Sequence, residues 1–174
     1  MSINIFFISI FTLLLIIFFG FKPLDIKPQE FLDVPVFQIK TFTLHELNKK
    51  GLITLMKGDE ALRYTDRYRV KGLDYTDNSR KYIANMRADN GVYRDQESTL
   101  DLDGNVLYNR EDGLIFKTDE ASYNKKTSIA NTKSNYVLYR DTNIVTGNNL
   151  EYNNQLNKIK SKNIVAKYQL QESN

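Results

Sequence analysis

Residues 100–117 read LDLDGNVLYNREDGLIFK, and their alternation decides the fold class. Leu100 and Leu102 alternate with aspartates, and Val106 and Tyr108 continue the two-residue spacing. Successive side chains of a β-strand point to opposite faces, so this spacing predicts strands with one apolar face.

The same spacing recurs further along the chain, at Leu114 and Phe116 and again at Tyr136 and Leu138. Several of these strands carry apolar residues at the intervening positions too. Two interpretations stay open: both faces are partly covered, or an apolar face is kept open.

Gly, Asn and Asp punctuate the chain from Val36 onward at intervals of about 6 to 13 residues, which is typical of short antiparallel strands. Asp103-Gly104 matches part of a calcium loop, but Thr99 and Arg110 occupy the first and last ligand positions and are unsuitable. We therefore predict a hairpin turn there. The residue pattern as a whole predicts an all-β sandwich or barrel.

Residues 115–124 resemble residues 144–153, which lie 29 residues further along, and residues 59–64 form a looser third copy. Each copy reads strand, polar turn, small or apolar residue, Tyr and then a turn. Such echoes indicate stacked strand units with a shared core; chance similarity among Asn-rich strands is the alternative.

Residues 3–21 carry no formal charge and are almost all apolar. As a helix the run is about 28 Å long, close to the bilayer core, so we predict one N-terminal transmembrane helix. A cleaved signal peptide is the alternative, although no small-x-small cleavage site follows the run. The predicted membrane-anchor residues are Ile3, Phe7, Phe11, Leu14 and Phe18.

Three segments follow from these patterns. We predict a transmembrane anchor over residues 1–22, a proline-containing linker over residues 23–35 and a β domain over residues 36–172. Lys22 and Lys27 follow the anchor, and by charge alone they weakly favour a cytoplasmic domain.

Composition argues against several classes of function. The net charge is +3, from 24 basic and 21 acidic interspersed residues, with no basic stripe for nucleic acid. The chain has no cysteine, and no Gly-x-Ser-x-Gly nucleophile motif accompanies its one histidine, His45. We expect no enzyme activity, no catalytic residue, no metal site and no cofactor.

Three sequence elements, taken in order, resemble motifs of the LptC family, the single-span periplasmic components of the lipopolysaccharide export bridge. Residues 100–106 and 112–123 resemble its Leu-x-Leu-x-Gly-x-Val and Asp-Gly-x-x-x-x-Thr-x-x-x-x-Tyr elements. Residues 147–152 resemble the Gly-x-x-Leu-x-Tyr element that follows. The match is best over residues 86–170, whereas residues 36–85 match loosely.

The resemblance implies a twisted, antiparallel, jelly-roll-like (OstA-like) β domain in the periplasm, preceded by one inner-membrane anchor. It implies that the anchor packs against an inner-membrane ABC transporter. The β domain would accept lipopolysaccharide and pass it to a soluble periplasmic protein of similar fold. The alternative is an anchored periplasmic scaffold whose β domain binds only protein; an anchored hydrolase is weaker, because nucleophile and base are missing.

Acyl chains in water need an apolar shield, and an apolar β groove supplies one without a catalytic group. The alternative is a closed core made of the same residues. The predicted lipid-binding groove residues are Leu100, Leu102, Val106, Tyr108, Leu114, Phe116, Tyr136, Leu138, Ile144, Leu150 and Tyr152.

The last predicted strand is expected to be an edge to which the soluble partner adds a strand. Its predicted residues are Asn163, Ile164, Val165, Ala166, Lys167 and Tyr168. The alternative is an edge that its lysines protect from pairing.

Overall fold

The computed structural model describes residues 3–20, 33–49 and 51–169. The chain divides into two units, residues 1–32 and 33–174, and each is described by itself. Most of the predicted linker, with Pro23 and Pro28, lies outside the described residues.

The N-terminal apolar run forms the helix α1 (Ile3–Gly20). Among the described residues, however, no helix is long and apolar enough to cross a membrane. The structure therefore does not support the predicted transmembrane helix. Phe7, Phe11, Leu14 and Phe18 lie on α1 with exposed side chains, and Ile3 is its first residue.

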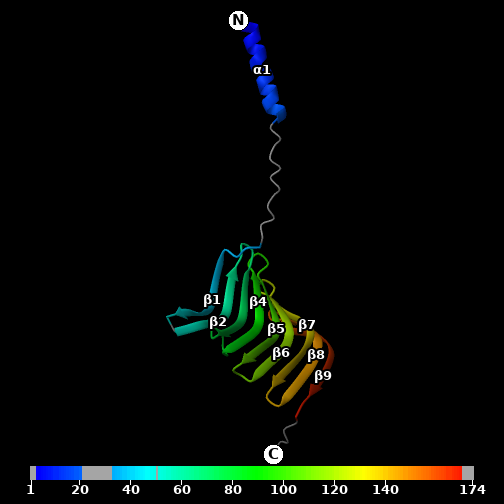
Figure 1. Ribbon diagram of the computed structural model, residues 1–174. Coiled ribbons are helices and arrows are strands. Elements are labelled where there is room, and N and C mark those ends of the chain that lie inside the picture. Colours follow the sequence, from blue (N-terminus) through cyan, green and yellow to red (C-terminus); the bar gives the residue numbers. More distant parts are fainter. Residues whose placement is uncertain (1–2, 21–32, 50, 170–174) are drawn as a thin grey trace, which may run out of the picture. The chain divides into compact units, whose positions relative to one another are not determined.

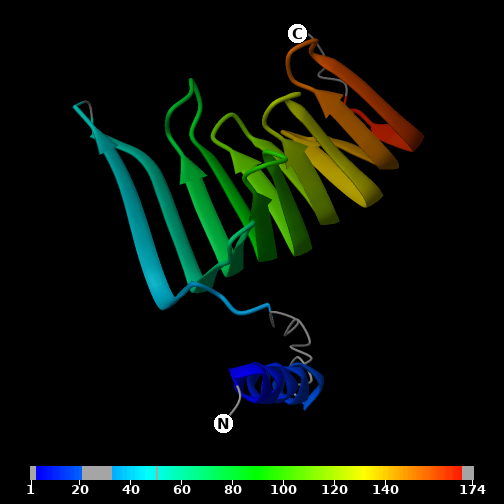
Figure 2. The same ribbon diagram turned by 90° about the horizontal axis from the view of Figure 1, so that it is seen from above.

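The second unit contains a single antiparallel sheet whose strand order follows the chain order (Figures 1 and 2). Each strand pairs with its neighbours in sequence through short hairpins. The strands are β1 (Phe37–Asn48), β2 (Gly51–Arg63), β3 (Tyr68–Asp77), β4 (Ala84–Arg94), β5 (Thr99–Arg110), β6 (Leu114–Asn124), β7 (Ile129–Arg140), β8 (Asn143–Asn153) and β9 (Lys158–Lys167).

The all-β, antiparallel prediction is confirmed, and the sheet is open and consistent with a jelly-roll-like fold. The predicted strand lengths are wrong, because several predicted turn signals lie in the middle of strands. The hairpin turn predicted at Asp103-Gly104 is one of these, since both residues belong to β5.

A line of irregular backbone crosses the sheet near the middle of its strands. Pairing registers shift there in the β4–β5, β5–β6, β6–β7, β7–β8 and β8–β9 pairs. Bulges and left-handed residues bend and twist strands, so we call this line the bend line; Figure 1 shows the bend plainly in β1 and β2. Its left-handed residues are Thr41, Gly72, Gly104, Asn105, Asn149 and Asn163.

The small buried core lies along the bend line. Leu73, Ala88, Leu102 and Val106 form one cluster, with exposed fractions between 3% and 6%. Residues from both halves of the strands pack against this cluster, among them Met86 from one half and Leu100 from the other. One face of the sheet, here called the inner face, therefore folds toward itself at the bend.

Candidate functional site

The inner face carries an apolar row on one side of the bend line that runs through all nine strands. Residues paired directly across strands share a face, and successive pairings link one residue of each strand to the next. The row consists of Leu44, Met56, Tyr75, Met86, Tyr108, Phe116, Leu138, Val145 and Ala166.

A second continuous row lies on the other side of the bend line, rich in tyrosine. It is linked by the same kind of pairing through all nine strands. The row consists of Phe37, Arg63, Tyr68, Tyr93, Leu100, Tyr123, Ala130, Tyr152 and Ile159. The two rows flank the buried cluster at the bend line. We call the inner face between them the trough, with the rows as its margins and the buried cluster as its floor.

Burial falls from the floor of the trough to its margins. Leu102, Val106 and Tyr136 are buried, with exposed fractions of 6%, 3% and 4%. The margin residues of β5 to β8, such as Phe116 and Leu138, are only half-buried. No side chain of the described residues is less than 2% exposed, so the inner face is lined by apolar groups that solvent reaches.

The structure brings ten of the eleven predicted groove residues to the inner face. Leu114 and Leu150 join the margin and floor residues there, because they share the alternation of Phe116 and Tyr152. Ile144 is the exception, since it pairs with Tyr139 on the opposite, outer face. Its inclusion in the groove set is therefore corrected.

Sequence reasoning missed the part of the trough formed by β1 to β4. Met56, Tyr75 and Met86 extend the apolar margin there, and Tyr68 and Tyr93 extend the tyrosine margin. The signal was present as two-residue alternation, but it changes phase at the bend line. Met86 and Ala88 of β4 face inward before the bend line, and Gly91 and Tyr93 do so after it.

Aromatic and polar contacts order the floor and the margins. The rings of Phe116 and Tyr136 stack with centroids 5.7 Å apart, and the Tyr136 hydroxyl lies 2.9 Å from Ser161 Oγ. Burial raises the pKa of the Tyr75 hydroxyl, and Asp77 and Glu46 add to that effect. The tyrosine therefore stays neutral at the margin of the apolar trough.

The floor also contains two buried hydroxyl groups. Thr118 Oγ1 and Thr132 Oγ1 lie 3.0 Å apart, and Thr118 Oγ1 donates to the carbonyl oxygen of Asn135 at 3.0 Å. Their hydrogen bonds satisfy both groups, so they do not make the floor reactive.

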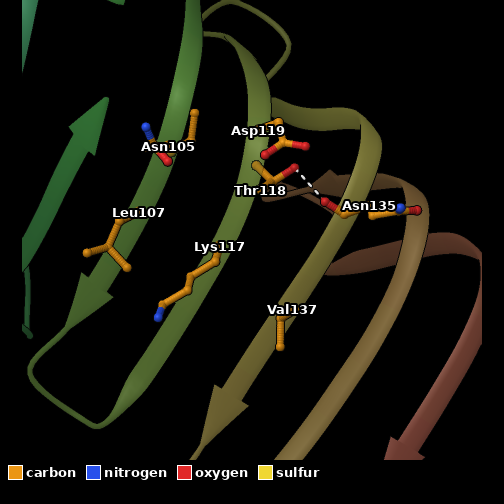
Figure 3. Close-up of a pocket in the computed structure, with 8 residues that line it drawn as sticks. Asn105, Leu107, Lys117, Thr118, Asp119, Asn135 and Val137 are labelled. Carbon is orange, nitrogen blue, oxygen red and sulfur yellow. Dashed lines mark hydrogen bonds between the residues drawn. The ribbon is translucent and has the colours of Figure 1, made fainter. Parts of the chain in front are cut away.

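Two open hollows lie on β5 to β7, beside the bend line. One, of about 440 Å³, includes Leu107, Lys117, Asp119 and Val137 (Figure 3). The other, of about 390 Å³, has Asp101, Asp103, Glu120 and Lys133 in its lining. Val106 and Thr118 of the bend line also belong to the first hollow, and Leu102 and Thr132 to the second. Both hollows have charged residues in their linings, whereas the row from Leu44 to Ala166 has none, so the two rows are the better candidate lipid site.

The last strand, β9, is an edge of the described sheet. Of the predicted edge residues, Asn163 to Lys167 belong to β9, and Tyr168 follows it directly. Ile164, Val165 and Tyr168 have exposed fractions of 55%, 58% and 70%. The strand β1 forms the other edge and was not singled out from sequence.

Nothing among the described residues forms a group of three or more His, Asp or Glu side chains suited to a metal ion. His45 lies on the outer face of β1, paired with Leu55, and its side chain is exposed.

Comparison with known proteins gives one family. The sequence model of the family described as "Lipopolysaccharide-assembly, LptC-related" matches residues 5–168. No curated protein matches the chain.

Proposed function

Because this chain belongs to the LptC family of lipopolysaccharide-assembly proteins, and thus to lipopolysaccharide transport, we propose that its inner-face trough carries the acyl chains of the lipid. The single observation that carries the proposal is the pair of rows, apolar except at Arg63, that cross all nine described strands with side chains accessible to solvent. Shielding apolar surface from water is worth about 25 cal/mol per Å². The trough needs no catalytic group to do this.

The proposed path runs along the trough toward the β9 end. An inner-membrane ABC transporter supplies lipopolysaccharide, and a soluble periplasmic protein of similar fold receives it at β9. The exposed apolar residues of β9 support that edge as the handover point, because a partner strand added there continues the rows Leu138–Val145–Ala166 and Tyr152–Ile159.

We further propose that the chain is attached to the inner membrane through the apolar side chains of α1, with the β domain in the periplasm. Exposed Phe11, Ile16 and Phe18 support this, with exposed fractions of 65%, 65% and 76%. Alkaline extraction of membranes tests it: the full chain stays in the pellet, and a chain lacking residues 3–20 is released. Recovery of the full chain in the soluble fraction contradicts the attachment, and a shortened mature mass indicates a cleaved signal.

The groove is tested with photo-crosslinking residues placed on adjacent positions of β7. A crosslinker at Leu138 faces the trough, whereas one at Val137 faces the outer side and serves as the matched control. Lipopolysaccharide adducts are expected at Leu138 and Leu114 and not at Val137. Adducts confined to protein, at Val165 and Tyr168, contradict lipid transfer and support a scaffold.

Leu114→Asp provides a second test of the same trough. A carboxylate on the inner face raises the cost of seating acyl chains, so we expect lipopolysaccharide capture to be lost while the chain stays folded. A folded variant that still carries lipid overturns the groove.

A further inference from the structure

The edge strand β9 separates its charges by face. Lys158 pairs with Asn153, Lys160 with Glu151 and Lys167 with Ile144 in the register with β8. All of these positions lie on the outer face, as does Lys162 opposite Asn148. The inner-face positions of β9 instead include Ile159 and Ile164, with exposed fractions of 62% and 55%.

Only one of these lysines has a carboxylate partner in the described structure. Lys160 Nζ lies 2.8 Å from Glu151 Oε1. Among the described residues, no carboxylate oxygen lies within 4.0 Å of the ammonium groups of Lys158, Lys162 or Lys167. The outer side of the edge thus carries positive charge that the sheet itself leaves unneutralised.

A second copy of this chain is a poor match for that charge. The other sheet edge, β1, presents Gln38, Lys40, Thr43 and His45 on its outer face, and none of them is acidic. Head-to-tail pairing of β9 with β1 of another copy places lysines beside Lys40. Pairing two copies of β9 places lysines beside lysines, and like charges directly across strands are destabilising.

We propose that β9 selects a strand of a different protein that carries Asp or Glu on its outer face and apolar residues on its inner face. The same lysines oppose pairing of β9 with copies of this chain. Lysines on edge strands commonly prevent unwanted pairing; here their restriction to one face leaves the apolar rows of the trough open to be continued. This inference rests on the proposed handover at β9 and adds the chemistry of the partner.

The test uses the full chain in detergent micelles and labelled peptides of about ten residues. One peptide alternates valine and glutamate, and its control alternates valine and glutamine. Fluorescence anisotropy is expected to show binding of the glutamate peptide about tenfold tighter than that of the control. The difference is expected to shrink at high salt, because the lysines are exposed.

A triple variant tests the lysines themselves. Lys158→Glu/Lys162→Glu/Lys167→Glu is expected to abolish the preference for the glutamate peptide. Lys57→Glu/Lys81→Glu/Lys125→Glu changes the net charge equally, away from β9, and is expected to keep it. Sedimentation of the full wild-type chain is expected to show no association through β9.

Equal binding of the two peptides, no binding of either, loss of preference in the control variant, or wild-type self-association through β9 each overturns the inference. Crosslinking of lipopolysaccharide at Leu138 is independent of these lysines. Failure of peptide selection with retained lipid adducts therefore removes the lysine inference alone, whereas loss of the adducts removes the proposed transfer function.

Discussion

Gly72 lies on the bend line with a φ of +62°, a conformation that residues with a Cβ rarely adopt. The carboxylate of Asp59, on the neighbouring strand, occupies the space beside it, and a Cβ added at Gly72 would collide with Asp59 Oδ2 unless that side chain moved. Gly104 repeats the arrangement with Asp89, whose Oδ2 also accepts a hydrogen bond from Asn105 Nδ2 at 2.7 Å. At both positions, a left-handed glycine bends its strand, and a carboxylate of the neighbouring strand fills the space that a Cβ would occupy.

We expect Gly72→Ala to lower the free energy of unfolding by about 1–3 kcal/mol, because it combines a strained φ with a collision. Thermal or urea unfolding of the full chain measures the loss. The double variant Gly72→Ala/Asp59→Ser is expected to recover only the part caused by the collision. A single variant as stable as the wild type contradicts the proposed role of Gly72.

The buried pair Thr118 and Thr132 gives a second prediction at this scale. Thr118→Val is expected to cost about 1–3 kcal/mol, since it removes the hydrogen bond to the Asn135 carbonyl and leaves Thr132 Oγ1 without that partner. In a double-mutant cycle, adding Thr132→Val is expected to cost less than it does in the wild type. Additive losses contradict coupling of the two hydroxyls.

At the scale of the strand, the bend line explains which parts of the fold the sequence could predict. Two-residue alternation predicts one shared face for Leu100, Leu102, Val106 and Tyr108, and the structure places them on one face. The bend in β5 contains two left-handed residues, and an even number leaves the alternation of faces unchanged on either side of it. In β6 and β8 the phase changes by one residue: Phe116 and Tyr123 both face inward although they are seven positions apart. A single periodicity applied to a whole strand therefore predicts apolar residues on both faces.

The bend line also explains why hairpin turns were predicted at positions that lie within strands, and why Ile144 lies outside the inner face. Gly, Asn and Asp favour left-handed backbone whether it closes a hairpin or bends a strand, so their presence alone does not distinguish the two. The apolar character of Ile144 predicts a place in the groove, whereas its pairing with Tyr139 puts it on the outer face. The 29-residue echo, by contrast, reflects real equivalence, since Phe116 and Val145 occupy corresponding places in β6 and β8.

Deleting one bend-line residue tests the phase change. Removal of Asp119 from β6 is expected to turn Ala121 and Tyr123 to the outer face, because a shift of one residue reverses every side chain beyond it. We expect loss of cooperative unfolding and rapid proteolysis. Removal of Lys81 from the β3–β4 connection is the control and is expected to be tolerated; equal tolerance of both deletions contradicts the phase change.

The β5–β6 hairpin gives a prediction on pH. Asp112 accepts hydrogen bonds from Arg110 Nε at 2.6 Å and Arg110 Nη2 at 2.8 Å. The hydrogen bonds from Arg110, chiefly, lower the pKa of Asp112 below its usual value of 3.8, although burial acts in the opposite direction. Because the folded pKa is the lower one, the stabilisation is present above the unfolded pKa and is lost as pH falls through the folded pKa.

We therefore expect Asp112→Asn to reduce the loss of stability below about pH 4, measured as the midpoint of urea unfolding against pH. Glu97→Gln, in the β4–β5 turn, is the matched control. If the midpoint of urea unfolding falls as steeply below pH 4 in Asp112→Asn as in the wild type, Asp112 is not the source of the acid sensitivity.

At the scale of the molecule, the described β domain is a linear series in which each strand contacts its neighbours in the chain. Its core cluster belongs to β3, β4 and β5, with no residue from the last hairpin. We expect a chain that ends at Arg140 to remain folded but less stable, since it loses the packing of β8 and β9 while keeping that cluster. Limited proteolysis and thermal unfolding check this, and complete unfolding of the shortened chain contradicts it.

Because the strand order follows the chain order, the length of the trough depends on the number of strands. Neighbouring strands lie about 4.8 Å apart, so duplicating one hairpin would lengthen the two rows by about 10 Å without rerouting any connection. Under the proposed function, the distance that the trough spans between donor and acceptor would thus depend on the number of hairpins in the sheet, since each hairpin contributes its own residues to both rows.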